Sequence, residues 1–143
     1  MSIIEASHRA AAYDAVHMNA LADFRLLADV PDEFTILFLQ GGASLQFAQV
    51  PMNLLADGET AGYVNTGTWG KKALSDALRV SPVYEAWSDT SGAFDRMPST
   101  EEIEIRDGSR YIHLTSNETI GGIRFAELPT FDVPTVTDMS SDF

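Results

Sequence analysis

The sequence predicts an α/β fold in which a mostly parallel sheet lies between two layers of helices. Short apolar runs alternate along the chain with longer segments of helical periodicity, a pattern typical of strand–helix–strand units with right-handed crossovers. The apolar run at residues 35–39 also lacks polar alternation, as expected of a strand buried on both faces. With 143 residues, the chain has the length of one domain.

Helical periodicity indicates three helices. The first is predicted at residues 10–28, because apolar side chains recur there every three or four positions and Pro31 follows. The second is predicted at residues 44–55, where Pro51 should kink the helix or shorten its start. The third is predicted at residues 69–79, directly after a glycine-containing break.

Short apolar runs indicate the strands. The run that ends at residue 115 gives the firmest prediction, and the run after Gly122 gives the weakest. Residues 88–99 are rich in Ser, Asp, Gly and Pro and predict a loop. The predicted strands are residues 35–39, 61–65, 82–86, 110–115, 123–125 and 134–138.

Composition and charge exclude several classes of function. With 21 acidic and 9 basic residues, the net charge of −12 argues against binding to a nucleic acid or an anionic membrane. The absence of cysteine excludes disulfides, a cysteine nucleophile and thiolate metal sites. The three histidines lack the spacing of metal ligands, so no metal is expected. No signal peptide or transmembrane run is evident, which predicts a cytoplasmic protein.

Small residues at positions 40–44 form a break between a predicted strand and a predicted helix. The sequence there is Gln-Gly-Gly-Ala-Ser, which leaves backbone N–H groups open at a helix N-terminus. Such a turn can bind a phosphate group. Taken alone, the same residues are more typical of a tight strand-to-helix turn that binds nothing.

Residues 65–72 resemble a nucleotide-binding P-loop only superficially. The first glycine of that motif would fall at Asn65, and Lys72 stands where the motif needs Ser or Thr, so a nucleoside triphosphatase is not supported. Trp69 either packs in the core or stacks on a flat ligand. Asp138 ends a predicted strand, where ligands bind in open α/β sheets, although it could equally cap a helix or face solvent.

The order of several segments is more specific than any one of them. Together they resemble the phosphoserine aminotransferase family, fold-type-I enzymes that depend on pyridoxal phosphate, over residues 4–142. This resemblance implies a three-layer large domain. The segments are Ser7-His8-Arg9, Phe38 to Phe47, Gly67-Thr68-Trp69, Thr115 to Gly122 and Asp138-Met139-Ser140-Ser141.

The resemblance also implies roles for individual residues. The backbone of Ala43 and Ser44 would hold the cofactor phosphate, although some family members have arginine at the position of Ser44. Trp69 would stack on the pyridine ring, and Thr119 would bond near the ring hydroxyl. Asp138 would pair with the ring nitrogen, keeping the nitrogen protonated so that the ring can accept electrons.

The resemblance further implies what the chain lacks. His8 and Arg9 match residues that bind the anionic groups of the substrate. The family's Schiff-base lysine has no counterpart, because Lys71 and Lys72, the only lysines in the sequence, match surface positions. Residues 1–143 are therefore expected to be part of a large domain without the Schiff-base lysine segment and the small C-terminal domain.

Two functions remain open at this stage. The first is a portion of a phosphoserine aminotransferase of serine biosynthesis, which exchanges an amino group between phosphoserine and 2-oxoglutarate. We expect this portion to form a homodimer or a higher association and to be inactive by itself. The alternative is a non-catalytic module that binds phosphate or pyridoxal phosphate; a chain with only a structural role is a further possibility.

Overall fold

The computed structural model describes residues 2–143 and divides into two compact units. The first, which we call the N-terminal unit, ends at Leu39, and the second, the sheet unit, comprises Gln40–Phe143. Each unit is described by itself.

The N-terminal unit is built around one long helix. A short 3-10 helix, η1 (Ile3–Glu5), precedes α1 (Ala11–Leu27), which confirms the predicted helix at residues 10–28. The guanidinium group of Arg25 donates hydrogen bonds of 2.6–3.0 Å to three backbone carbonyls beyond the helix, and so fixes the chain that follows it. Those carbonyls belong to Val30, Pro31 and Phe34.

The strand predicted at residues 35–39 is wrong. The structure has no strand there, and Leu37, Phe38 and Leu39 are more than half exposed. A continuous apolar run indicates burial only if other elements cover it, and the N-terminal unit provides no strand to pair with this one among its described residues. The rings of His17 and Phe38 meet edge to face, with 5.6 Å between their centroids.

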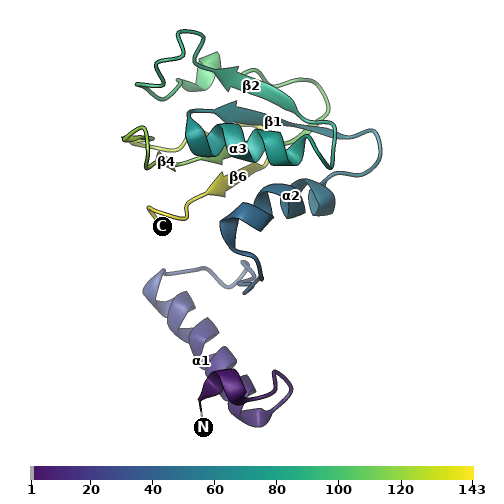
Figure 1. Ribbon diagram of the computed structural model, residues 1–143, viewed down its shortest axis with the longest axis vertical. Coiled ribbons are helices and arrows are strands. Elements are labelled where there is room, and N and C mark those ends of the chain that lie inside the picture. The colour runs from purple at the N-terminus through teal and green to yellow at the C-terminus, as the bar shows by residue number, and fades with distance from the viewer. Residues whose placement is uncertain (1) are drawn as a thin grey trace. The chain divides into compact units, whose positions relative to one another are not determined.

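The sheet unit alternates strands with two helices, as Figure 1 shows. All the strands and helices predicted beyond residue 40 are present within a few residues of their expected bounds, and Pro51 lies inside α2. The short elements η2 and β4 were not predicted. The elements are α2 (Gly42–Leu54), β1 (Thr60–Asn65), α3 (Thr68–Ala77), β2 (Tyr84–Ser88), η2 (Thr100–Glu102), β3 (Ser109–Thr115), β4 (Asn117–Glu118), β5 (Ile123–Arg124) and β6 (Thr135–Asp138).

Four parallel strands form the main sheet, in the order β2-β1-β3-β6. Tyr63 of β1 lies opposite His113 of β3, and Thr115 of β3 lies opposite Asp138 of β6. Because the strands are parallel, their carboxyl ends meet at one edge of the sheet. The segments that follow β1 and β3 therefore lie beside the end of β6.

Apolar side chains cover both faces of this sheet. On one face, Phe47 of α2 and two alanines of α3 pack against Tyr63 and Tyr111. On the opposite face, Ile112 and Leu114 are fully buried under Ile103, which follows η2, and under Phe131 and Val133. The predicted α/β class with a parallel sheet is thus confirmed. Within the sheet unit, α2 and α3 lie on the first face, whereas loop segments and the residue after η2 cover the second, so the predicted second layer of helices is not seen there.

Candidate functional site

A pocket of about 310 Å³ opens at the carboxyl-terminal edge of the sheet. Its size is within the range of small-molecule sites, roughly 300–1,000 Å³. All its lining residues belong to the sheet unit and come from α2, α3 and the segments that follow β3 and β6. They are Gly41, Gly42, Ala43, Ser44, Phe47, Trp69, Asn117, Thr119, Asp138, Ser140 and Ser141.

The five residues predicted to hold a cofactor all line this one pocket. Trp69, Thr119 and Asp138 converge because they follow or end parallel strands that are successive in the sheet. Trp69 follows β1, Thr119 follows β3 and Asp138 ends β6. Ala43 and Ser44 complete the wall from the first turn of α2. Their individual roles stay predictions.

The turn at the start of α2 leaves its first N–H groups open. Gly41 is the N-cap, with φ of 88°, and Gly42 has φ of 60°, conformations that favour glycine. A Cβ atom on Gly41 would also lie 2.3 Å from Leu45 Cδ2. Because the N-cap residue is glycine, it has no side chain that could accept hydrogen bonds from the first N–H groups of the helix. The amide groups of the first turn can therefore bind an anion, helped by the partial positive charge of the helix end.

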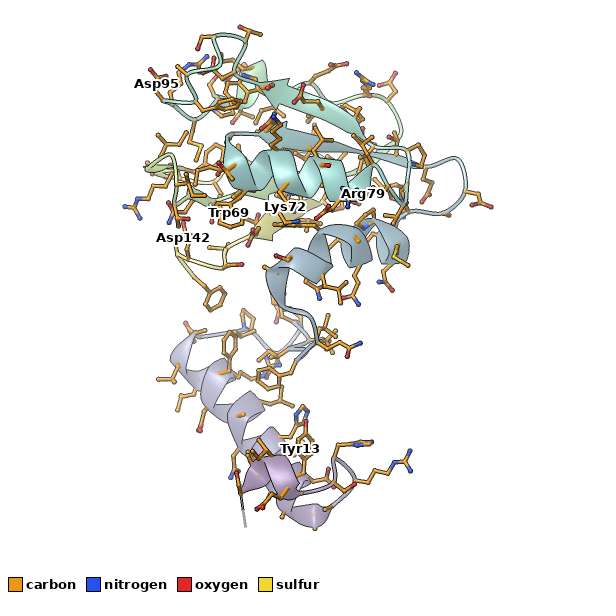
Figure 2. The ribbon with its side chains drawn as sticks, viewed as in Figure 1. Tyr13, Trp69, Lys72, Arg79, Asp95 and Asp142 are labelled. Carbon is orange, nitrogen blue, oxygen red and sulfur yellow. The ribbon has the colours of Figure 1, made fainter. Side chains whose placement is uncertain are left out.

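Trp69 and Thr119 are joined across the mouth of the pocket. The indole Nε1–H of Trp69 donates a hydrogen bond of 2.9 Å to Thr119 Oγ1. The tryptophan is half-buried, and Figure 2 shows it at the start of α3. The core alternative for this residue is thus not what the structure shows, because the ring borders the pocket. The bond fixes the ring and leaves the threonine hydroxyl proton free for another acceptor.

Asp138 is held by the turn that follows it. Its Oδ1 accepts hydrogen bonds from the backbone N–H and the hydroxyl of Ser140, at 3.1 and 2.5 Å. Among the described residues, no hydrogen bond reaches its other oxygen, Oδ2. An oriented carboxylate with one free oxygen suits a ligand that presents an N–H group.

A buried histidine lies behind the site. His113 of β3 stacks on Tyr63 at 4.7 Å between ring centroids and meets the edge of Phe47 at 6.2 Å. Burial lowers the pKa of His113 to about 4, against the opposing effect of the Asp138 charge. Its Nδ1 atom is buried without a hydrogen-bond partner. It borders a second cavity of about 380 Å³ that shares Asp138 with the first. The packed position expected for His113 is confirmed.

A buried glutamate near the pocket escaped the sequence reasoning. Glu118 is fully buried, and its carboxylate accepts hydrogen bonds from the N–H groups of Trp69 and Gly70, at 2.9 and 2.7 Å. It lies in the same segment as Thr119, but nothing local in the sequence indicates a partner some fifty positions away. Ser140, which orients Asp138, was also missed, although it lies only two positions further on and an aspartate commonly accepts the backbone N–H two residues later.

The two lysines are not part of this pocket's lining. His8 and Arg9 belong to the N-terminal unit, which is described by itself. Lys72 forms an ion pair with Asp76 at 2.7 Å, and Lys71 borders a different cavity. Figure 2 places Lys72 on α3, beyond Trp69. Within residues 2–143 no group of His, Asp and Glu could hold a metal ion.

The pocket lining combines three kinds of binding group. They are the open N–H groups at the start of α2, the indole of Trp69 and the Asp138 carboxylate. The N–H groups suit an anionic group, and the carboxylate suits a protonated nitrogen. A flat molecule with a phosphate on one side and a ring N–H on another matches this arrangement.

Comparison with known proteins agrees with this geometry, although no family model matches the chain. Phosphoserine aminotransferases of Niallia circulans and Dichelobacter nodosus are 48% and 43% identical over 143 residues. The solved phosphoserine aminotransferase of Bacillus circulans subsp. alkalophilus superposes with a TM-score of 0.90 at 48% identity. Over its whole length the chain is similar in sequence and fold to phosphoserine aminotransferases.

The match to phosphoserine aminotransferases extends along the whole chain but not along the whole of those proteins. The alignments cover 99% and 100% of the chain and 40% of each of the two curated relatives. A pyridoxal-phosphate-bound phosphoserine aminotransferase from Trichomonas vaginalis superposes with a TM-score of 0.89 at 35% identity, over 43% of its length. Within the described residues, no helix is long and apolar enough to cross a membrane.

Proposed function

We propose that this chain forms the cofactor-binding part of a phosphoserine aminotransferase. The observation that carries the proposal is the convergence of Ala43, Ser44, Trp69, Thr119 and Asp138, from distant segments, on one pocket. A match at 43–48% identity along the whole chain also favours this function over an unrelated binding module. The protein would act in exchange of an amino group between phosphoserine and 2-oxoglutarate.

The chain's residues fit pyridoxal phosphate. The open N–H groups of Ala43 and Ser44 would bind the phosphate, since the pocket lining contains no arginine or lysine in the described structure. The indole of Trp69 would cover one face of the pyridine ring. The Thr119 hydroxyl, which already accepts the indole N–H, would donate its own proton to the ring oxygen.

Asp138 would hold the proton on the ring nitrogen. Its Oδ1 is engaged by Ser140, so its Oδ2 is the atom available to that N–H group. A neighbouring neutral imidazole, His113, brings no positive charge that would compete for the carboxylate. When bound, the cofactor supplies an electron-accepting ring for amino transfer, and the protonated nitrogen strengthens it in that role.

The substrate groups and the wider assembly belong to the same proposal. His8 and Arg9 would bind the anionic groups of the substrate, which suits the bidentate geometry of arginine. Neither lysine of the sequence lines the pocket, so this chain alone is expected to bind the cofactor without catalysing amino transfer. A cytoplasmic homodimer without nucleic-acid or membrane partners completes the proposal.

Replacement of Trp69 by alanine tests the proposal. We expect the affinity for 4′-deoxypyridoxine 5′-phosphate to fall about fivefold to 150-fold, because stacking on an aromatic side chain contributes on the order of 1–3 kcal/mol. This analogue lacks the aldehyde, so adventitious reaction with Lys71 or Lys72 cannot mimic binding. Isothermal titration calorimetry on the 143-residue chain measures the affinity directly.

The matched control is Trp87→Phe, which changes the other tryptophan of the sequence. Trp87 lies in β2, packs against the core on the second face of the sheet and does not line the pocket. The affinity of this variant should equal that of the unmodified chain. Equal affinity of Trp69→Ala and the unmodified chain would contradict the assignment of Trp69. Absence of measurable binding by the unmodified chain would contradict the proposal for the isolated chain as a whole.

A further inference from the structure

The carboxylate of Glu118 is completely buried, and its hydrogen-bond donors all lie at or just before the start of α3. Oε2 accepts the N–H of Trp69 at 2.9 Å, and Oε1 accepts the N–H of Gly70 at 2.7 Å. The hydroxyl of Thr66 donates a third hydrogen bond to Oε1, at 3.2 Å. A buried carboxylate needs such partners, because without them its removal from water is costly.

Two glycines make room for this carboxylate. A Cβ atom on Gly67 would lie 3.0 Å from Glu118 Cδ, and the glycine has φ of 154° and ψ of −144°. A Cβ atom on Gly70 would lie 2.9 Å from the backbone oxygen of Val64 and 3.3 Å from Glu118 Oε1. The first turn of α3 can therefore approach both β1 and the glutamate only with glycine at these positions.

Two consecutive residues thus hold Trp69 at both of its ends. Glu118 binds the backbone N–H, and Thr119 accepts the indole N–H at 2.9 Å. We propose that Glu118 is a positioning residue, which with Thr119 fixes the indole plane of Trp69 for a flat ligand. The inference rests on the proposed function. It gives Glu118 a role in ligand binding that acts through Trp69 and not through contact with the ligand.

The contacts of Glu118 also distinguish the N-terminus of α3 from that of α2. The first-turn N–H groups of a helix have no partners within the helix, and they carry its partial positive charge. At α3 two of these groups are bound by Glu118, whereas α2 starts without a side-chain cap. The phosphate end of the ligand is therefore directed to α2.

A double-mutant cycle tests the inference in a Trp87→Phe background, where Trp69 is the sole tryptophan. Glu118→Gln keeps the shape of the side chain but places an amide donor against one of the two N–H groups. We expect a changed near-ultraviolet dichroism band of Trp69 and affinity for 4′-deoxypyridoxine 5′-phosphate about tenfold lower, as for coupled residues in contact. In chains that also carry Trp69→Ala, which leaves no ring to position, Glu118→Gln should lower the affinity much less.

Equal losses in the chains with Trp69 and in the Trp69→Ala chains would overturn the inference, because a merely structural glutamate would act in both. Glu127→Gln, on an exposed loop, is the matched control and should change neither readout. The dichroism band is measured without ligand, so it decides the inference even where the analogue does not bind. An unchanged band would overturn it.

Amide hydrogen exchange on the unmodified chain covers the case in which Glu118→Gln does not fold. The N–H groups of Trp69 and Gly70 should exchange slowly although they lie in a first helical turn. Those of Ala43 and Ser44, at the open end of α2, should exchange rapidly. Rapid exchange at Trp69 and Gly70 would show that Glu118 does not hold them, and would overturn the inference.

Discussion

Acidification from pH 6.5 to pH 4 should lower the free energy of unfolding by about 3 kcal/mol through His113 alone. The imidazole is buried, stacked on Tyr63 and edge-on to Phe47, and burial lowers its pKa from 6.5 to about 4. The negative charge of Asp138 only partly offsets this effect. His113 is therefore the side chain that should dominate the acid sensitivity of the sheet unit.

The direction follows from proton uptake in the two states. Between pH 4 and pH 6.5 the unfolded chain binds a proton at His113 and the folded chain does not, so stability rises with pH. Above pH 6.5 His113 is neutral in both states, and this part of the free energy of unfolding is fully present. Below pH 4 both states carry the proton, and this part of the free energy of unfolding is lost.

Urea unfolding followed by far-ultraviolet dichroism, repeated across this pH range, measures the effect. His113→Phe removes the titrating group and keeps a flat ring, so the difference between the two chains isolates His113 from the acidic residues. His8→Phe, at an exposed histidine, is the matched control and should keep the full pH dependence. An identical pH dependence in His113→Phe and the unmodified chain would show that His113 is not responsible.

Replacement of Leu114 by alanine should destabilise the sheet unit by about 2–5 kcal/mol, the usual cost of removing a fully buried leucine side chain. Leu114 is 0% exposed and packs on the sheet face opposite to α2 and α3. Loop residues such as Phe131 cover it there. A loss of this size would establish that these loops form a true second core.

Leu78→Ala provides the control, because this leucine is 54% exposed at the end of α3. It should change the stability by less than about 0.5–1 kcal/mol. Denaturant midpoints of both variants, measured at neutral pH, give the comparison. Similar small losses in both would mean that the second face is loosely covered and that Leu114 contacts water.

The fold was predictable wherever local pattern and tertiary burial agree. The helix at α1 follows from its apolar spacing, and β1 and β3 follow from apolar runs that the sheet does bury. Residues 35–39 have an equally apolar run, yet Leu37, Phe38 and Leu39 are exposed. An apolar run favours burial, but whether it is buried depends on the elements that pack around it.

The site was predictable only in part. A carboxylate at the end of β6 and a glycine-rich turn before α2 were visible as local features, because parallel strands bring their carboxyl ends together. The ligand roles of Trp69 and Thr119 came from the family resemblance. The bond between these two residues and the burial of Glu118 join positions far apart in sequence, and no local pattern encodes them.

The lack of arginine and lysine in the pocket lining also bears on how ionic strength acts on the site. Amide N–H groups attract an anion over a short range that dissolved salt screens little, whereas the net charge of −12 repels the same anion from a distance. Salt weakens chiefly the second effect. Phosphorylated ligands would then associate faster as ionic strength rises, the reverse of what a lysine- or arginine-lined phosphate site produces.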